Sequence, residues 1–146
     1  MKKFLVILSI LLISLFVYSI ALGKDGGAPR VTTLSGAEEV PARDPDGSGF
    51  ASITLNVGQG MVCWEIWYDN IGTPFAAHIH KAPAGVNGGV VVPLFIPSIN
   101  GGCTSANPEL IQDIIDFPEN YYVNVHNAEY PGGAIRGQLS NPGQSK

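Results

Sequence analysis

The chain has 146 residues, a formal net charge of −4 and only 14% charged residues. This length favours a single domain. The sequence has no basic cluster, which argues against nucleic acid as a partner, and its 18 glycines and 11 prolines favour many turns over long helices.

The first 23 residues have the organisation of an export signal. Lys2 and Lys3 precede an unbroken apolar run, which ends in the small-residue segment ALG. This order is typical of a secretory signal peptide, so we predict cleavage after Gly23. The alternative is an uncleaved membrane anchor, because the run is long enough to cross a bilayer. Residues 24–146 then form one secreted or periplasmic domain.

Six runs along the remaining chain have the pattern of β-strands. Residues 50–57 alternate between apolar and polar, whereas residues 61–69 are apolar on both faces and indicate a central strand. Turn signals rich in glycine and proline separate the runs, which favours an antiparallel β-sandwich or barrel with Greek-key connections. The other predicted strands cover residues 75–80, 88–95, 121–127 and 133–139.

One short helix is predicted as a connection between strands. Asn107 is a favoured N-cap residue, and Pro108 fits the first helical turn. The helix should end before Pro118. The segments 24–30 and 140–146 are predicted to be loose ends of the domain.

The two cysteines, Cys63 and Cys103, are predicted to form a disulfide. An exported protein meets an oxidising compartment, where one bridge is the default for two cysteines. The bridge would close a loop of about 40 residues, worth about 4 kcal/mol in the chain-entropy model. The alternative is a pair of thiolate metal ligands, although Cys63 has no neighbouring cysteine or histidine.

The three histidines fall on two of the predicted strands. Side chains alternate across a strand, so His78 and His80 share one face of the run 75–80. His126 lies on the polar face of the run 121–127. If the two strands are close, three imidazoles can converge on one ion. Nitrogen ligands suit copper or zinc, and three ligands leave a fourth position open.

A structural role for these histidines is the alternative. A single histidine is more often a surface residue, or a core residue bonded to a carbonyl, than a metal ligand. The chain contains no other histidine, so random scatter is a poorer explanation of the H-x-H pair. Both hypotheses therefore stay open at this point.

Three longer motifs, taken in order, are similar to those of a known family. They are TLSGAEEVP at 33–41, AAHIHKAPAGVNGGVVVPL at 76–94 and YYVNVHNAEYPGGAIRGQL at 121–139. These motifs resemble the CHRD domain family, named after repeats in the developmental regulator chordin. The resemblance covers residues 31–139 and implies an all-β, immunoglobulin-like sandwich of the single-domain exported bacterial type. It does not imply a settled activity.

The family's histidine pattern is similar to that of copper/zinc superoxide dismutases. Those enzymes also carry an H-x-H pair on one strand of a Greek-key sandwich and an intradomain disulfide. They use more than three histidines and an aspartate for two metals, whereas three histidines here allow only a mononuclear site or one that borrows carboxylates. Glu129, three residues after His126, is a candidate fourth ligand, although a solvated turn residue is the favoured interpretation.

Arg136 is the candidate catalytic residue. If its strand pairs with the His126 strand, its guanidinium lies near the open metal position and attracts a small anion such as superoxide. The favoured alternative is a structural clamp with Glu129 or Glu38.

The leading hypothesis is an exported protein that binds one copper ion, or alternatively zinc, with superoxide dismutation as a candidate reaction. The rival hypothesis is a non-catalytic extracellular module that binds protein or matrix. A homo-oligomer stays open, and membrane contact is expected only through residues 1–23 if they are not cleaved.

Overall fold

The computed structural model describes residues 26–94 and 100–144. The predicted signal peptide therefore lies outside the described residues. Within them, no helix has the length and apolar character needed to cross a membrane.

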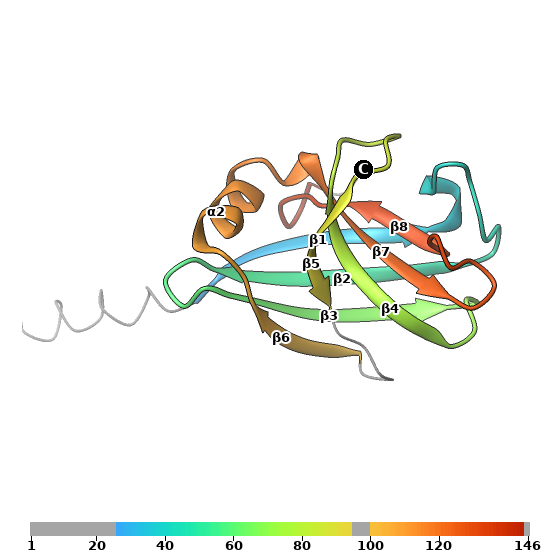
Figure 1. Ribbon diagram of the computed structural model, residues 1–146, viewed down its shortest axis with the longest axis horizontal. Coiled ribbons are helices and arrows are strands. Elements are labelled where there is room, and N and C mark those ends of the chain that lie inside the picture. The colour runs from blue at the N-terminus through green and yellow to red at the C-terminus, as the bar shows by residue number, and fades with distance from the viewer. Residues whose placement is uncertain (1–25, 95–99, 145–146) are drawn as a thin grey trace, which may run out of the picture.

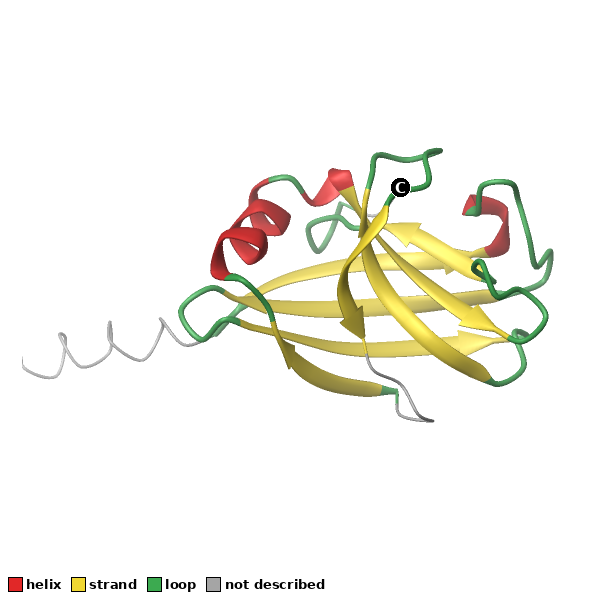
Figure 2. Cartoon of the chain, in the orientation of Figure 1, coloured by secondary structure: helices red, strands yellow, loops and turns green. Residues whose placement is uncertain are grey.

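Eight strands dominate the described part of the chain (Figures 1 and 2). A short 3-10 helix, η1, follows the first strand, and a second, η2, precedes the seventh strand. The bounds are β1 Ala28–Ser35, η1 Gly36–Glu38, β2 Ser48–Asn56, β3 Met61–Asp69, β4 Pro74–Lys81, β5 Gly89–Leu94, β6 Gly101–Ser105, α2 Pro108–Asp116, η2 Pro118–Asn120, β7 Tyr121–Asn127 and β8 Ile135–Gln138.

The strands form one antiparallel sheet in the order β5-β4-β7-β8-β1-β2-β3-β6. The half with β4 and β7 crosses over the half with β2 and β3 (Figure 1). The edge strands β5 and β6 come into contact, which nearly closes the sheet. The connections from β3 to β4 and from β6 to β7 cross between the halves, as in a Greek key. The predicted all-β antiparallel class is confirmed, and its two layers are halves of a single sheet.

Alternation along each strand separates the core from the outer face. On β3, Trp64 and Ile66 point into the core, whereas Trp67 is 47% exposed. On β4, Ala77 and Ile79 are fully buried in the same core. His78 and His80, which alternate with these two residues along β4, therefore lie on the outer face of the sheet.

Two strands were missed by the sequence prediction. β1 begins at Ala28, inside the segment 24–30 that was predicted to be loose. β6 is short and glycine-containing, so its sequence has little alternation. Pairing with long neighbours stabilises both strands, since β1 pairs with β2 and β6 pairs with β3.

The predicted helix and disulfide are both present. The Asn107 side chain accepts a hydrogen bond from the Glu109 backbone N–H at 2.7 Å, and Pro108 opens the helix α2. At the other end, Arg30 of β1 donates to the Ile115 carbonyl at 2.5 Å, which satisfies a carbonyl left free by the helix end. The disulfide between Cys63 and Cys103 joins β3 to the edge strand β6.

Candidate metal centre

The three histidines lie together because β4 and β7 are hydrogen-bonded neighbours. In this pairing His80 faces Tyr122, and Ala76 faces His126. His78 and His80 are two residues apart on β4, so both point to the outer face, where His126 also lies. One ring nitrogen from each histidine lies within 4.8 Å of the others. Among the described residues, this is the one group of three or more histidine, cysteine or acidic side chains close enough to hold an ion.

Backbone carbonyls fix the orientation of two of the rings. His80 Nδ1 lies 2.9 Å from the Gly88 carbonyl, and His126 Nδ1 lies 3.1 Å from the Pro131 carbonyl. A carbonyl only accepts, so both Nδ1 atoms carry the proton. Each neutral ring then keeps a lone pair on Nε2. This arrangement is typical of histidines that bind metal, because the second nitrogen is held by an outer partner.

The unprotonated Nε2 atoms of His80 and His126 are the nitrogens that these rings can offer to a metal ion. His80 Nε2 is buried and has no hydrogen-bond partner among the described residues. His126 Nε2 lies 3.0 Å from His78 Nδ1, so without an ion the His78 Nδ1–H donates a hydrogen bond to His126 Nε2. Two nitrogens bound to one tetrahedral zinc ion would be about 3.3 Å apart, given Zn–N bonds of about 2.0–2.1 Å. An ion could therefore take the place of the hydrogen atom between His78 and His126 with little movement of these two rings.

The electrostatics of the cluster keep the rings neutral. Burial lowers the pKa of His78 to about 4, and the neighbouring histidines contribute to this shift. Burial also lowers the pKa of His80 and His126, despite their carbonyl partners. Neutral imidazole is the form that binds metal. The cluster is thus ready to bind an ion at neutral pH.

An aromatic stack supports His80 from β7. The ring of Tyr122 stacks on His80 with centroids 4.8 Å apart and planes 9° apart. The Arg136 guanidinium also contacts this ring and lies 4.1 Å from the Tyr122 ring centroid. The Tyr122 hydroxyl accepts from the Gly88 N–H at 3.1 Å, and the Gly88 carbonyl holds His80. Tyr122 therefore positions His80 both directly and through Gly88.

Arg136 holds the loop that covers the site. Its side chain is 2% exposed, and it donates to the Val86 carbonyl at 3.1 Å and to Asn87 Oδ1 at 3.0 Å. These residues belong to the covering loop, residues 82–88, which connects β4 to β5. The charge of Arg136 also acts on Glu39, whereas the sequence-based alternative named Glu129 or Glu38 as its partner. Arg136 lies on the histidine side of the sheet, but two of its N–H groups are engaged by the loop.

Two buried residues beside the histidines had no assigned role in the sequence. Glu39, in the EEVP motif, is 6% exposed, and Asn124 of β7 is 3% exposed. Asn124 Nδ2 donates to Glu39 Oε2 at 3.4 Å. Burial raises the pKa of Glu39 to about 7, although the charge of Arg136 opposes the shift. Glu39 belongs to a motif that served for the family resemblance alone, and only the fold brings it to this face.

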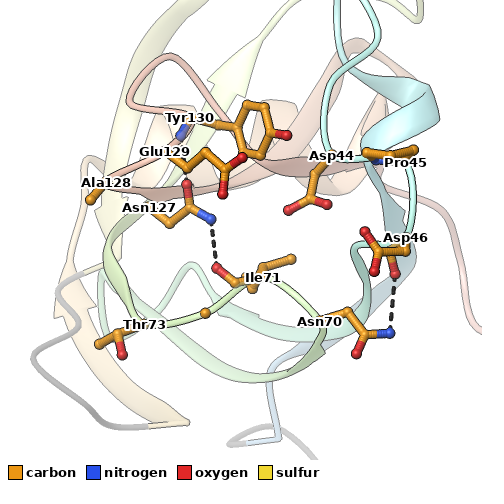
Figure 3. Close-up of a pocket in the computed structure, with 11 residues that line it drawn as sticks. Asp44, Pro45, Asp46, Asn70, Ile71, Thr73, Asn127, Ala128, Glu129 and Tyr130 are labelled. Atoms are coloured by element: carbon orange, nitrogen blue, oxygen red, sulfur yellow. Dashed lines mark hydrogen bonds between the residues drawn. The ribbon is translucent and has the colours of Figure 1, made fainter.

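A separate acidic cavity lies at the end of the fold near His126. It has a volume of about 500 Å³, and Asp44, Asp46 and Glu129 line it (Figure 3). Burial raises the pKa of Asp44, and the nearby Asp46 raises it further. Glu129 is exposed there and is not part of the three-histidine group. The cavity is therefore distinct from the histidine site.

Comparison with known proteins identifies the family of this chain, and it does not assign an activity. The sequence model of the CHRD domain matches residues 30–139, which is most of the chain. No curated protein and no solved structure matches the chain. The predicted family is confirmed, and the chain belongs to the CHRD domain family.

Proposed function

We propose that this protein binds one transition-metal ion through His78, His80 and His126. The observation that carries the proposal is the buried, unpartnered Nε2 of His80, which lies in a group whose nitrogens fall within 4.8 Å of one another. A buried nitrogen lone pair without a partner is costly, and an ion would satisfy it. The protein has three histidines in all, so the site would be mononuclear.

Copper is the first candidate for the ion and zinc the second. Cu²⁺ leads the divalent affinity order at nitrogen sites. The three ligands leave a coordination position for a small molecule, which is the arrangement of a reactive site rather than a closed structural one. The predicted export signal, together with the disulfide, supports a secreted or periplasmic location, because disulfides persist in oxidising compartments.

Superoxide dismutation is the redox reaction to assay first. An accessible copper ion supplies a Cu(II)/Cu(I) couple, and the positive charge of Arg136 lies close enough to lower the pKa of His80. The N–H groups of Arg136 that bind Val86 and Asn87 are not offered to an anion. Support for this reaction is therefore weaker than support for metal binding.

The test is metal stoichiometry in purified protein and matched variants. We expect one Cu²⁺ or Zn²⁺ per chain in the wild type, and loss of the ion in the double variant His78→Ala, His80→Ala. Val90→Ala is the control, because Val90 pairs with His80 in the ladder but is 51% exposed and offers no ligand. Equal stoichiometry in the wild type and the double variant would refute the proposal. A dismutase assay on the loaded wild type then tests the reaction.

A non-catalytic binding module is the second candidate function. Phe50 on β2 and Trp67 on β3 lie opposite each other, with ring centroids 5.9 Å apart. Both rings are exposed, at 38% and 47%. Exposed aromatic pairs are common in protein interfaces, including those between copies of one chain. Two results together would favour this alternative. The protein taken from its native compartment would contain no metal, and Trp67→Ala would weaken self-association or binding to a protein partner.

A further inference from the structure

Two buried oxygen atoms beside the histidines have unused hydrogen-bonding capacity. Glu39 Oε1 and Asn124 Oδ1 have no hydrogen-bond partner within the described ranges. Their side chains are 6% and 3% exposed, respectively. Leaving such acceptors buried and unpaired costs stability. A donor that occupies the space beside them would remove this cost.

Both oxygens belong to the same outer face as the proposed metal centre. Asn124 faces His78 across the ladder between β4 and β7, and it precedes His126 by two residues. Glu39 reaches Asn124 from the segment after η1. A directly opposed pair of residues in such a ladder has Cβ atoms only about 5 Å apart. Asn124 is therefore a neighbour of the site.

Gly133 brings the two oxygens together under the loop that also holds His126. A Cβ atom at Gly133 would lie 2.6 Å from both Glu39 Oε1 and Asn124 Oδ1. The φ angle of Gly133 is 130°, which residues with side chains rarely adopt. The same loop supplies the Pro131 carbonyl that orients His126. Only a glycine at this position lets the loop pack directly against the two oxygens, so the loop that orients His126 also holds them beside the histidines.

We propose that Glu39 and Asn124 accept hydrogen bonds from a protic ligand, such as water or hydrogen peroxide, at the fourth position of the three-histidine site. The inference rests on the proposed function, because the ligand is held by the ion. A bare anion brings no hydrogen to the two acceptors, and above pH 7 it also meets the negative charge of ionised Glu39. Superoxide is such an anion, so the inference disfavours superoxide dismutation and favours reactions of protic ligands such as hydrogen peroxide.

Azide binding to the copper-loaded protein tests the inference, because azide is a bare anion. The variant is Glu39→Gln, and the control is Glu38→Gln, an exposed neighbour in η1. We expect every protein to bind one copper. At pH 8, where Glu39 is mostly ionised, we expect Glu39→Gln to bind azide about tenfold more tightly than wild type, since a nearby negative charge is removed. Glu38→Gln should match wild type. Electron paramagnetic resonance follows both copper and azide.

The outcomes separate this inference from the proposed function. Equal azide affinity in wild type and Glu39→Gln, with one copper in each, would overturn the inference and leave metal binding intact. Loss of copper in Glu39→Gln alone would overturn it too, because Glu39 would then be a ligand. Failure of wild type to bind copper or zinc overturns both proposals. If Glu39→Gln does not fold, pulsed resonance of wild type in D₂O decides: strongly coupled deuterons of a protic ligand on copper, distinct from the weakly coupled N–D groups of the histidine rings, are expected, and their absence refutes the inference.

Discussion

The outer faces of the two halves of the sheet differ in what covers them. On β3, core residues alternate with exposed or half-buried ones, and Trp67 reaches solvent. On β7, all seven residues are buried, including the polar outer residues Asn124 and His126. Alternation is the same in both strands, so the difference comes from loops. The covering loop and the segment around Glu39 lie over β7, where buried polar groups then need partners.

The largest expected effect is the loss of the covering loop's anchor. Arg136→Met removes two hydrogen bonds to the loop and leaves the Glu39 carboxylate buried without its cation. We expect metal-free protein to lose about 3 kcal/mol in the free energy of unfolding, measured with urea. Trp67→Ala, on the uncovered half, should cost about 0.5 kcal/mol or less. Equal losses would show that covering does not distinguish the two halves.

The second prediction concerns pH and the buried carboxyl group. The pKa of Glu39 rises from its ordinary value of 4.5 to about 7 in the folded protein. The stability that protonated Glu39 contributes is therefore present below pH 4.5 and is lost as the pH rises to about 7, by about 2–3 kcal/mol. The stability of wild type relative to Glu39→Gln should fall by this amount between pH 4 and pH 8 in metal-free protein.

The histidines change the pH dependence of stability in the opposite direction to Glu39. Their contribution is the same in wild type and in Glu39→Gln. Their pKa values are lowered below the ordinary 6.5, in His78 to about 4, so the stability they contribute is lost as the pH falls from 6.5 towards 4. Comparison of the two proteins cancels this contribution. A difference that stays constant with pH would contradict the buried environment of Glu39.

The third prediction compares two neighbouring tyrosines of β7, one on each face of the strand, and its expected effect on stability is small. Tyr122→Phe removes the hydroxyl that accepts from Gly88, whose carbonyl orients His80. We expect a loss of about 1 kcal/mol in stability and about tenfold in copper affinity, measured by competition with a chelator. Tyr121→Phe is the control, since Tyr121 bonds Asp113 and lies on the core side of the same strand. Equal affinities in the two variants would exclude a positioning role for Tyr122.

The sequence alone determined most of the local structure. The strand predictions 61–69 and 121–127 match β3 and β7, and the Asn107 cap marks the start of α2. These features depend on alternation and capping, which are properties of neighbouring residues. β1 and β6 were missed because their stability comes from strands they pair with, and pairing is not visible in a short window.

The candidate site also has features that the sequence predicts and features that only the tertiary structure sets. Alternation along a single strand is enough to place His78 and His80 on one face, whereas no sequence pattern singled out Glu39. Only the tertiary structure put β7 beside β4, buried Arg136 under the covering loop, and brought Gly133 against Glu39 and Asn124. The physical reason is distance along the chain. A side chain's direction is set by its own strand, whereas its neighbours across the sheet are set by Greek-key crossings that join residues far apart in sequence.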